Sequence, residues 1–150
     1  MPETQGQYIS SSDFTQPPTI THFSSNLSVS RTSGNANTWV DFPSGSITIT
    51  GSVGEYYMIQ HQCVYTPGNA LFNHIKWAAV SGCTVSVDGQ SGNYATTVYL
   101  TIFAIVQLTA TSATVKLQDF SSATTGTNSL LAGAGGAAQA GMDVVVIKLF

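Results

Sequence analysis

Apolar and polar residues alternate with a period of two along much of the chain from residue 19 onward. In Ser46-Ile47-Thr48-Ile49-Thr50 the alternation is strict, which is typical of a strand with one face in the core and one in water. Short runs rich in valine, isoleucine, threonine and aromatic residues recur between clusters of glycine, proline, asparagine and serine. No window combines a 3.6-residue apolar period with helix caps. The pattern therefore predicts an all-β protein.

The predicted strands number about ten, and turn residues separate them. They cover residues 19–23, 27–31, 38–42, 46–50, 55–65, 72–79, 84–87, 94–108 (one strand or two), 113–120 and 143–150. Short strands at this spacing indicate a sandwich or a jelly roll, and we expect a jelly-roll β-sandwich. The uncharged, glycine- and alanine-rich stretch 126–141 is expected to be a long loop. It is either a flexible connection or a loop whose small side chains let the backbones of three copies of the chain approach one another closely in a trimer.

Residues 1–24 differ from the rest of the chain and are expected to form an extended N-terminal arm, followed by a jelly-roll domain over residues 25–150. The segment is polar and is interrupted by Pro17-Pro18, which favours extended polyproline geometry. One interpretation is a frayed tail. The other is an arm that docks onto another chain through Tyr8, Ile9 and Phe14, because aromatic and β-branched residues are depleted in disordered tails. These three residues are the candidates for attachment to a larger particle.

Both faces of the run 94–108 are apolar, which predicts an oligomer. One face carries Val98, Leu100, Ile102, Ala104, Val106 and Leu108, and the other carries Tyr99, Phe103 and Ile105. A sandwich buries only the inner face of each sheet, so the second face needs another cover. The sequence predicts no helix to supply it, and large apolar patches usually mark interfaces, so another subunit is the simplest cover. The pattern leaves open which of the two faces lies inside.

Several segments resemble the C1q/tumour-necrosis-factor-like family. Gly45-Ser46-Ile47-Thr48-Ile49 and Gly54-Glu55-Tyr56-Tyr57-Met58 are similar to its glycine, short strand and Gly-x-Tyr-x-Phe entry to a long central strand, with Met58 in place of phenylalanine. Thr97-Val98-Tyr99-Leu100 with Val115-Lys116-Leu117 resembles its paired late strands, and 144–150 resembles its closing strand. The resemblance spans residues 38–150. The family's Gly-Asp pair is replaced by Thr109-Ala110-Thr111-Ser112.

This resemblance implies a ten-stranded jelly roll assembled as a tight homotrimer around a threefold axis. Some members of the family bind calcium near that axis, but no acidic cluster in this chain carries the property over. Together with the two-faced run, the resemblance selects a set of residues for packing in the trimer or the core. They are Tyr56, Met58, Val98, Tyr99, Leu100, Phe103, Ile105 and Leu149.

Composition narrows the function classes. Only 7% of the 150 residues are charged, against about 25% in ordinary domains, and four basic residues with a net charge of −3 do not suit a phosphate-tracking nucleic-acid binder. A 43% apolar content disfavours disorder.

The N-terminal residues show no signal peptide, and no apolar run is long enough for a membrane span. Without an export signal, Cys63 and Cys83 are interpreted as reduced thiols, with a disulfide as the alternative.

Candidate chemistry is sparse, so we expect neither an enzyme nor a cofactor. His22, His61 and His74 lack metal-site spacing, although His61 and Cys63 share a strand face and could supply two ligands. The acids are dispersed, and no Gly-x-Ser-x-Gly elbow is present. Residues 133–138 match the letters of a dinucleotide fingerprint but lack the strand before and the helix after that its chemistry requires.

These observations favour a structural virion protein, made in the host cytoplasm and carried on a phage particle as a capsid decoration, head-fibre or tail-tip trimer. Its expected partners are copies of itself and a capsid or tail protein. The alternative is a carbohydrate- or receptor-binding module of a host-recognition fibre, because exposed aromatic rings suit the faces of sugars. The aromatic residues considered for a sugar platform are Trp39, Tyr56, Tyr57, Tyr65, Trp77, Tyr94 and Tyr99.

Overall fold

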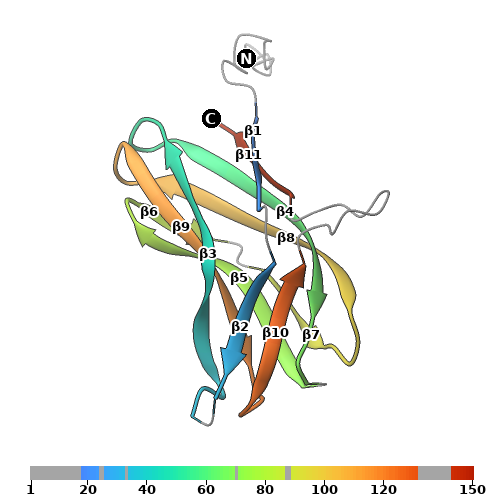
Figure 1. The fold of residues 1–150 in the computed structure, drawn as a ribbon. Helices are drawn as coiled ribbons and strands as arrows, with labels where there is room; N and C mark the ends of the chain where they lie inside the picture. The colour runs from blue at the N-terminus through green and yellow to red at the C-terminus, as the bar shows by residue number, and fades with distance from the viewer. Residues whose placement is uncertain (1–17, 24–25, 33, 70, 87–88, 132–142) are drawn as a thin grey trace, which may run out of the picture.

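The computed structural model describes residues 18–23, 26–32, 34–69, 71–86, 89–131 and 143–150. These residues form eleven strands and no helix (Figure 1). The predicted all-β sandwich is therefore confirmed, with eleven strands where about ten were expected. Tyr8, Ile9 and Phe14 lie outside the described residues, as does the 133–138 motif.

The strands form two antiparallel sheets. The seven-stranded sheet contains β1 (Thr19–His22), β2 (Leu27–Arg31), β4 (Tyr56–Thr66), β6 (Cys83–Ser86), β8 (Val98–Leu108), β10 (Gly126–Leu131) and β11 (Asp143–Lys148). The four-stranded sheet has the order β3 (Thr38–Thr50), β9 (Ser112–Ser121), β5 (Phe72–Ser81) and β7 (Gln90–Asn93). Each connection from β2 to β10 passes from one sheet to the other, as expected for a jelly roll.

Strand β4 is the centre of the larger sheet. It pairs with β8 along one side and with β11 and then β10 along the other. Strand β1 flanks β11, and β2 flanks β10, so the two ends of this sheet are built from different strand pairs (Figure 1). Because β8 and β11 both lie beside β4, the outward side chains of these three strands share one surface.

The core lies between the two sheets and follows the alternation read from the sequence. Every second residue of β9 from Ala113 to Ser121 is buried, and Trp77 and Ile75 of β5 are fully buried beside them. The opposing layer includes Ile59 and Tyr65 of β4. Each large apolar side chain buried in this way contributes about 1.5–3 kcal/mol relative to an exposed position.

Two predicted strands are joined in the structure, and the strands predicted over 94–108 and 143–150 are shorter. Residues 38–42 and 46–50 form the single strand β3, with a shift in its register against β9 between Asp41 and Ser46. Ser44, with a φ of 60°, lies inside this irregular stretch. The run 94–108 contributes one strand, β8, which begins only at Val98.

Two strands, β7 and β10, were not predicted. Strand β7 consists of Gln90, Ser91, Gly92 and Asn93, which carry no apolar pattern to read. The prediction of a loop over 126–141 is wrong for its first six residues, because β10 pairs with both β2 and β4 and buries Asn128 and Leu130. Residues 132–142 of that stretch lie outside the described residues.

Strand β1 falls inside the segment 1–24 that was expected to be an arm. Its four residues pair with β11, from Thr19 opposite Val146 to His22 opposite Asp143. These residues are therefore part of the sheet, as the predicted strand 19–23 required. Any test of the arm has to leave β1 in place.

Candidate functional site

Strand β8 settles which face of the run 94–108 lies inside. Ile102, Ala104 and Val106 are fully buried in the core. The opposite positions point out of the sandwich, with Tyr99 71% and Phe103 39% exposed. Of the residues selected for trimer or core packing, Val98 and Leu100 lie on the inner face and are half-buried.

The outward residues of β8 continue an apolar surface across the sheet. Directly paired residues on neighbouring strands lie side by side on one face. Met58 of β4 is paired with Ile105 of β8 and with Ile147 of β11, so three apolar side chains form one row. The surface, called here the outer apolar face, comprises Ile20, Tyr56, Met58, Tyr99, Phe103, Ile105, Val145 and Ile147.

The chain after β11 extends this face beside Tyr56. The Leu149 backbone N–H donates to the Tyr56 carbonyl oxygen at 2.8 Å, and the Tyr56 and Phe150 rings lie with centroids 4.8 Å apart. Leu149 and Phe150 are both exposed. Leu149, which was selected for packing in the trimer or the core, thus lies next to Tyr56, at the edge of the outer apolar face.

Charge is scarce on this surface. Among the outward positions of β4, β8 and β11 in the described chain, Asp143 is the only acidic or basic residue, and Gln60, Gln62 and Gln107 stand between the apolar side chains. Depletion of charge is the compositional signature of the buried centre of a protein–protein interface. Low charge is shared with the chain as a whole, of which 7% of the residues are charged, so the contiguous row of apolar side chains is what distinguishes this face.

A surface ion pair fixes the start of β4 against β11. Glu55 accepts hydrogen bonds from Lys148 Nζ at 2.8 Å, from the Tyr57 hydroxyl at 2.8 Å and from the Ser52 backbone N–H at 3.0 Å. These donors, Lys148 first, lower the pKa of Glu55 to about 2. The contacts tie β11, β4 and the preceding turn together on the side of the sheet that faces the other sheet.

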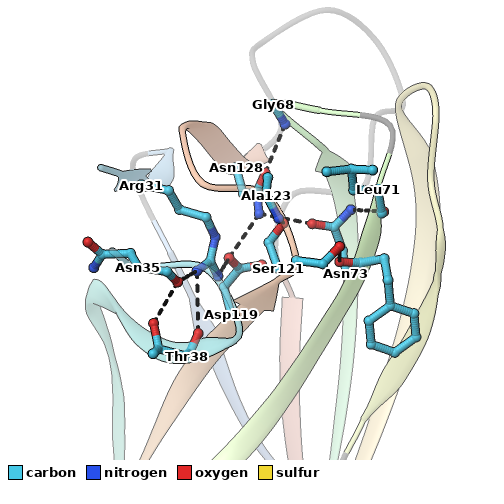
Figure 2. A network of polar contacts seen from close by, with 12 residues as sticks. Arg31, Asn35, Thr38, Gly68, Leu71, Asn73, Asp119, Ser121, Ala123 and Asn128 are labelled. Carbon is cyan, nitrogen blue, oxygen red and sulfur yellow. Dashed lines mark hydrogen bonds and ion pairs between the residues drawn. The ribbon is translucent and has the colours of Figure 1, made fainter. Parts of the chain in front are cut away.

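A second polar group, inside the sandwich, joins β2 to β9 (Figure 2). Arg31 forms an ion pair with Asp119, and their side chains have exposed fractions of 1% and 0%. Arg31 Nη1 also donates to the Asn35 carbonyl at 3.0 Å and the Thr38 carbonyl at 3.3 Å. The guanidinium therefore holds the β2–β3 connection as well as the carboxylate.

Three further side chains complete this buried network. The Tyr65 hydroxyl donates to Asp119 Oδ1 at 3.2 Å, and Asn128 Nδ2 donates to Asp119 Oδ2 at 2.9 Å. Asn128 Oδ1 in turn accepts the Gly68 backbone N–H at 2.8 Å, and its Nδ2 also reaches Asn73 Oδ1 at 3.2 Å (Figure 2). Burial raises the pKa of Asp119 above its usual value despite these donors. The network joins strands of both sheets and lies in the interior, so its role is structural.

The pair His61 and Cys63 proves to be part of the core. The His61 ring lies 5.6 Å from the Trp77 ring and 6.1 Å from the Phe23 ring. Burial lowers the pKa of His61 to about 4 and raises the pKa of the Cys63 thiol to about 12. Cys63 and Cys83 are not bridged. No group of three histidine, cysteine or acidic residues suited to a metal ion occurs in the described part of the chain.

The outer face of the four-stranded sheet carries an aromatic cluster of Trp39, Phe72, His74 and Phe120. Phe120 of β9 is paired with Trp39 of β3 on one side and His74 of β5 on the other. The Trp39 ring centroid lies 5.0 Å from that of His74 and 5.3 Å from that of Phe120. Lys76 Nζ lies 4.0 Å from the Trp39 ring centroid.

Only part of this cluster was accessible to sequence reasoning. Trp39 was among the candidate platform residues, but Tyr57, Tyr65 and Trp77 from the same set are buried in the core. Phe72, His74 and Phe120 were missed. The period-two alternation around Ile75 and Asp119 would have placed them on one side of their strands, but it does not show which strands become neighbours.

Comparison with the models of known protein families gives no match, and comparison with curated proteins gives none either. Within the described residues, no helix is long and apolar enough to span a membrane.

Proposed function

We propose that this protein is a structural component of a virus particle that assembles as a homotrimer through the outer apolar face. The observation that carries the proposal is the row of Met58, Ile105 and Ile147, flanked by the exposed rings of Tyr99 and Phe103. Contiguous exposed apolar patches usually mark interfaces. The threefold assembly is what the resemblance to the C1q/tumour-necrosis-factor-like family implies.

The energetics favour association through this face. Burying one large apolar side chain that is exposed in the monomer contributes about 1.5–3 kcal/mol at most, and a trimer repeats each contact three times. Few charges have to be desolvated, because Asp143 is the only acidic or basic residue among the described outward positions of β4, β8 and β11. The glutamines between the apolar residues can form hydrogen bonds across the interface.

The oligomeric state is tested by native mass spectrometry at micromolar protein. The wild type is expected to be a trimer, and Ile105→Lys is expected to dissociate it while leaving a folded β-rich monomer, because Ile105 points away from the core. Thr48→Lys, on the exposed face of β3, is the matched control and should remain trimeric. A wild-type monomer would overturn the assembly, and so would an Ile105→Lys protein that stays trimeric.

The attachment role is proposed for the N-terminal segment that carries Tyr8, Ile9 and Phe14. An extended segment can add as a strand to the edge of a partner's sheet, with alternate side chains entering pockets. Ordering it costs about 1–2 kcal/mol per residue in backbone entropy, so one arm binds weakly. Three arms on one trimer raise the avidity by about 10²–10⁴ through effective concentration.

Deleting residues 1–17 tests the attachment role and keeps β1, which pairs with β11. The truncated protein is expected to melt at the wild-type temperature, to remain trimeric and to lose co-sedimentation with particles that lack their own copy. The triple substitution of Tyr8, Ile9 and Phe14 by serine should have the same effect. Undiminished co-sedimentation of both variants would show that the sandwich domain makes the contact.

The second candidate function is a carbohydrate- or receptor-binding module on a host-recognition fibre. The observation that favours it is the aromatic cluster, which lies on the sheet opposite the outer apolar face. Association through one sheet would leave the other facing outward. The two functions are compatible, because a trimer on a particle can also bind a host surface.

A further inference from the structure

We propose that the aromatic cluster binds a sugar bearing a carboxylate, with Trp39 and Phe72 contacting the sugar ring and Lys76 pairing with the carboxylate. The inference deepens the second candidate function by naming residues and a ligand class. It does not depend on the trimer, because all of its residues lie in the four-stranded sheet of one chain.

The cluster presents ring surface to solvent on a rigid support. Trp39 is 37% and Phe72 42% exposed, although both could pack inside a sandwich. Phe72 is held against Phe120 with ring centroids 6.1 Å apart, and Phe120 supports Trp39 from the neighbouring strand. Because three paired strands carry these rings, the platform requires no rearrangement of the backbone to receive a ligand.

The next row of side chains supplies polar partners. Asp41, Gln118 and Lys76 are directly paired across β3, β9 and β5. Gln118 Nε2 donates to Asp41 Oδ1 at 2.8 Å, and Lys116 forms an ion pair with the same carboxylate. A sugar offers C–H groups with a partial positive charge to the negative faces of aromatic rings, and hydroxyl groups to polar neighbours.

The charge of Lys76 selects an acidic ligand. Of the four basic side chains in the chain, Arg31, Lys116 and Lys148 each form an ion pair. Lys76 has no ion pair with any carboxylate of the described residues and lies instead over the Trp39 ring. Lys76, Lys116 and Asp41 together give this region a charge of +1, whereas the whole chain carries −3. The local charge therefore complements an anion.

Tryptophan fluorescence provides a specific readout of the site. The chain contains two tryptophans, and Trp77 is fully buried, so a spectral change on adding sugar reports Trp39. The probes are two matched pairs that differ in a carboxylate-bearing group: methyl β-glucuronide against methyl β-glucoside, and 3′-sialyllactose against lactose. We expect saturable binding of the acidic member with a Kd of about 1–10 mM, which corresponds to a weak, shallow site.

Charge and stacking are separated by variants. An exposed ion pair is worth about 0.2–1 kcal/mol, so the acidic sugar should bind up to about fivefold more tightly than its neutral partner. Lys76→Gln should abolish that preference, whereas Lys148→Gln, which removes the same charge elsewhere, should keep it. Trp39→Ala and Phe72→Ala should each remove saturation-transfer signals from the sugar in NMR spectra, with unchanged melting temperatures confirming the fold.

Each alternative outcome counts against a different statement. Equal binding of neutral and acidic sugars, unaffected by Lys76→Gln, would overturn the acidic ligand and leave a carbohydrate-binding module standing. A flat titration with all four sugars would overturn both. Neither result bears on the trimer, which native mass spectrometry tests separately.

Discussion

Replacing Arg31 by methionine tests whether the buried network holds the two sheets together. The substitution leaves the Asp119 carboxylate in the interior without its cation, and removing one partner of a buried pair costs about 3–5 kcal/mol. It also removes the donor to the Asn35 and Thr38 carbonyls, each worth about 1 kcal/mol. Domains of this size are stable by about 5–15 kcal/mol, so the loss should be large but measurable by urea unfolding.

A double-mutant cycle isolates the interaction between the two charges. Asp119→Asn keeps oxygen and nitrogen near Tyr65 and Asn128 but removes the charge that Arg31 pairs with. The double variant, Arg31→Met with Asp119→Asn, should lose about 1–3 kcal/mol less than the sum of the single losses, because it leaves no buried charge unpaired. The same cycle on the exposed pair Asp41 and Lys116 should give a coupling of at most about 1 kcal/mol.

The pH dependence gives an independent check. In Arg31→Met the folded-state pKa of Asp119, already raised by burial, should rise further above its unfolded value. The folded state then binds more protons than the unfolded state, so the stability of the variant falls as pH rises. Its deficit relative to the wild type should therefore be smaller at pH 4 than at pH 7. Additive losses in the cycle, or a deficit that does not change with pH, would refute the conclusion that Arg31 and Asp119 form a buried ion pair that holds the two sheets together.

Other predictions concern the core and one turn. Burial lowers the pKa of His61 to about 4, so acid should destabilise the wild type more than His61→Leu. As pH falls from 6.5 to 4, the free energy of unfolding measured in urea should decrease by about 3 kcal/mol more in the wild type than in the variant. An equal pH dependence of the two proteins would count against a neutral buried imidazole. Gly82 has a φ of 68°, and a methyl group there would lie 2.2 Å from the Ser112 carbonyl oxygen. Gly82→Ala should therefore lower the free energy of unfolding by about 1–3 kcal/mol more than Gly54→Ala, because Gly54, with a φ of 93°, has open space around it. Similar melting temperatures of the two variants would contradict this prediction. The thiol of Cys63 is buried and its pKa is raised to about 12, so it should react with a disulfide reagent only after unfolding, whereas Cys83 should react in the native protein. Reaction of both thiols at one rate in the native protein would contradict the burial of Cys63.

Local pattern was sufficient to predict the fold class and most strands. The alternation in β2 and in the second half of β3 reflects a sheet with one solvent-exposed face, and it can be recognised from residues that are close together in the sequence. It failed at β7, where no apolar residue marks a face, and at β10, which looks like a glycine-rich loop. Both strands exist because neighbours far away in the sequence supply their hydrogen bonds.

The candidate surfaces depended both on the sequence pattern and on the tertiary structure. The sequence by itself determined that β8 is apolar on both sides, and from this we predict a cover for one side beyond the sandwich. Which side that is follows only from the position of the four-stranded sheet, which covers Ile102 and leaves Phe103 outside. The aromatic cluster and the pair of Arg31 with Asp119, 88 residues apart, likewise arise from strand order. Alternation is a property of one strand, whereas the partners of a side chain are set by which strands the sheets bring together.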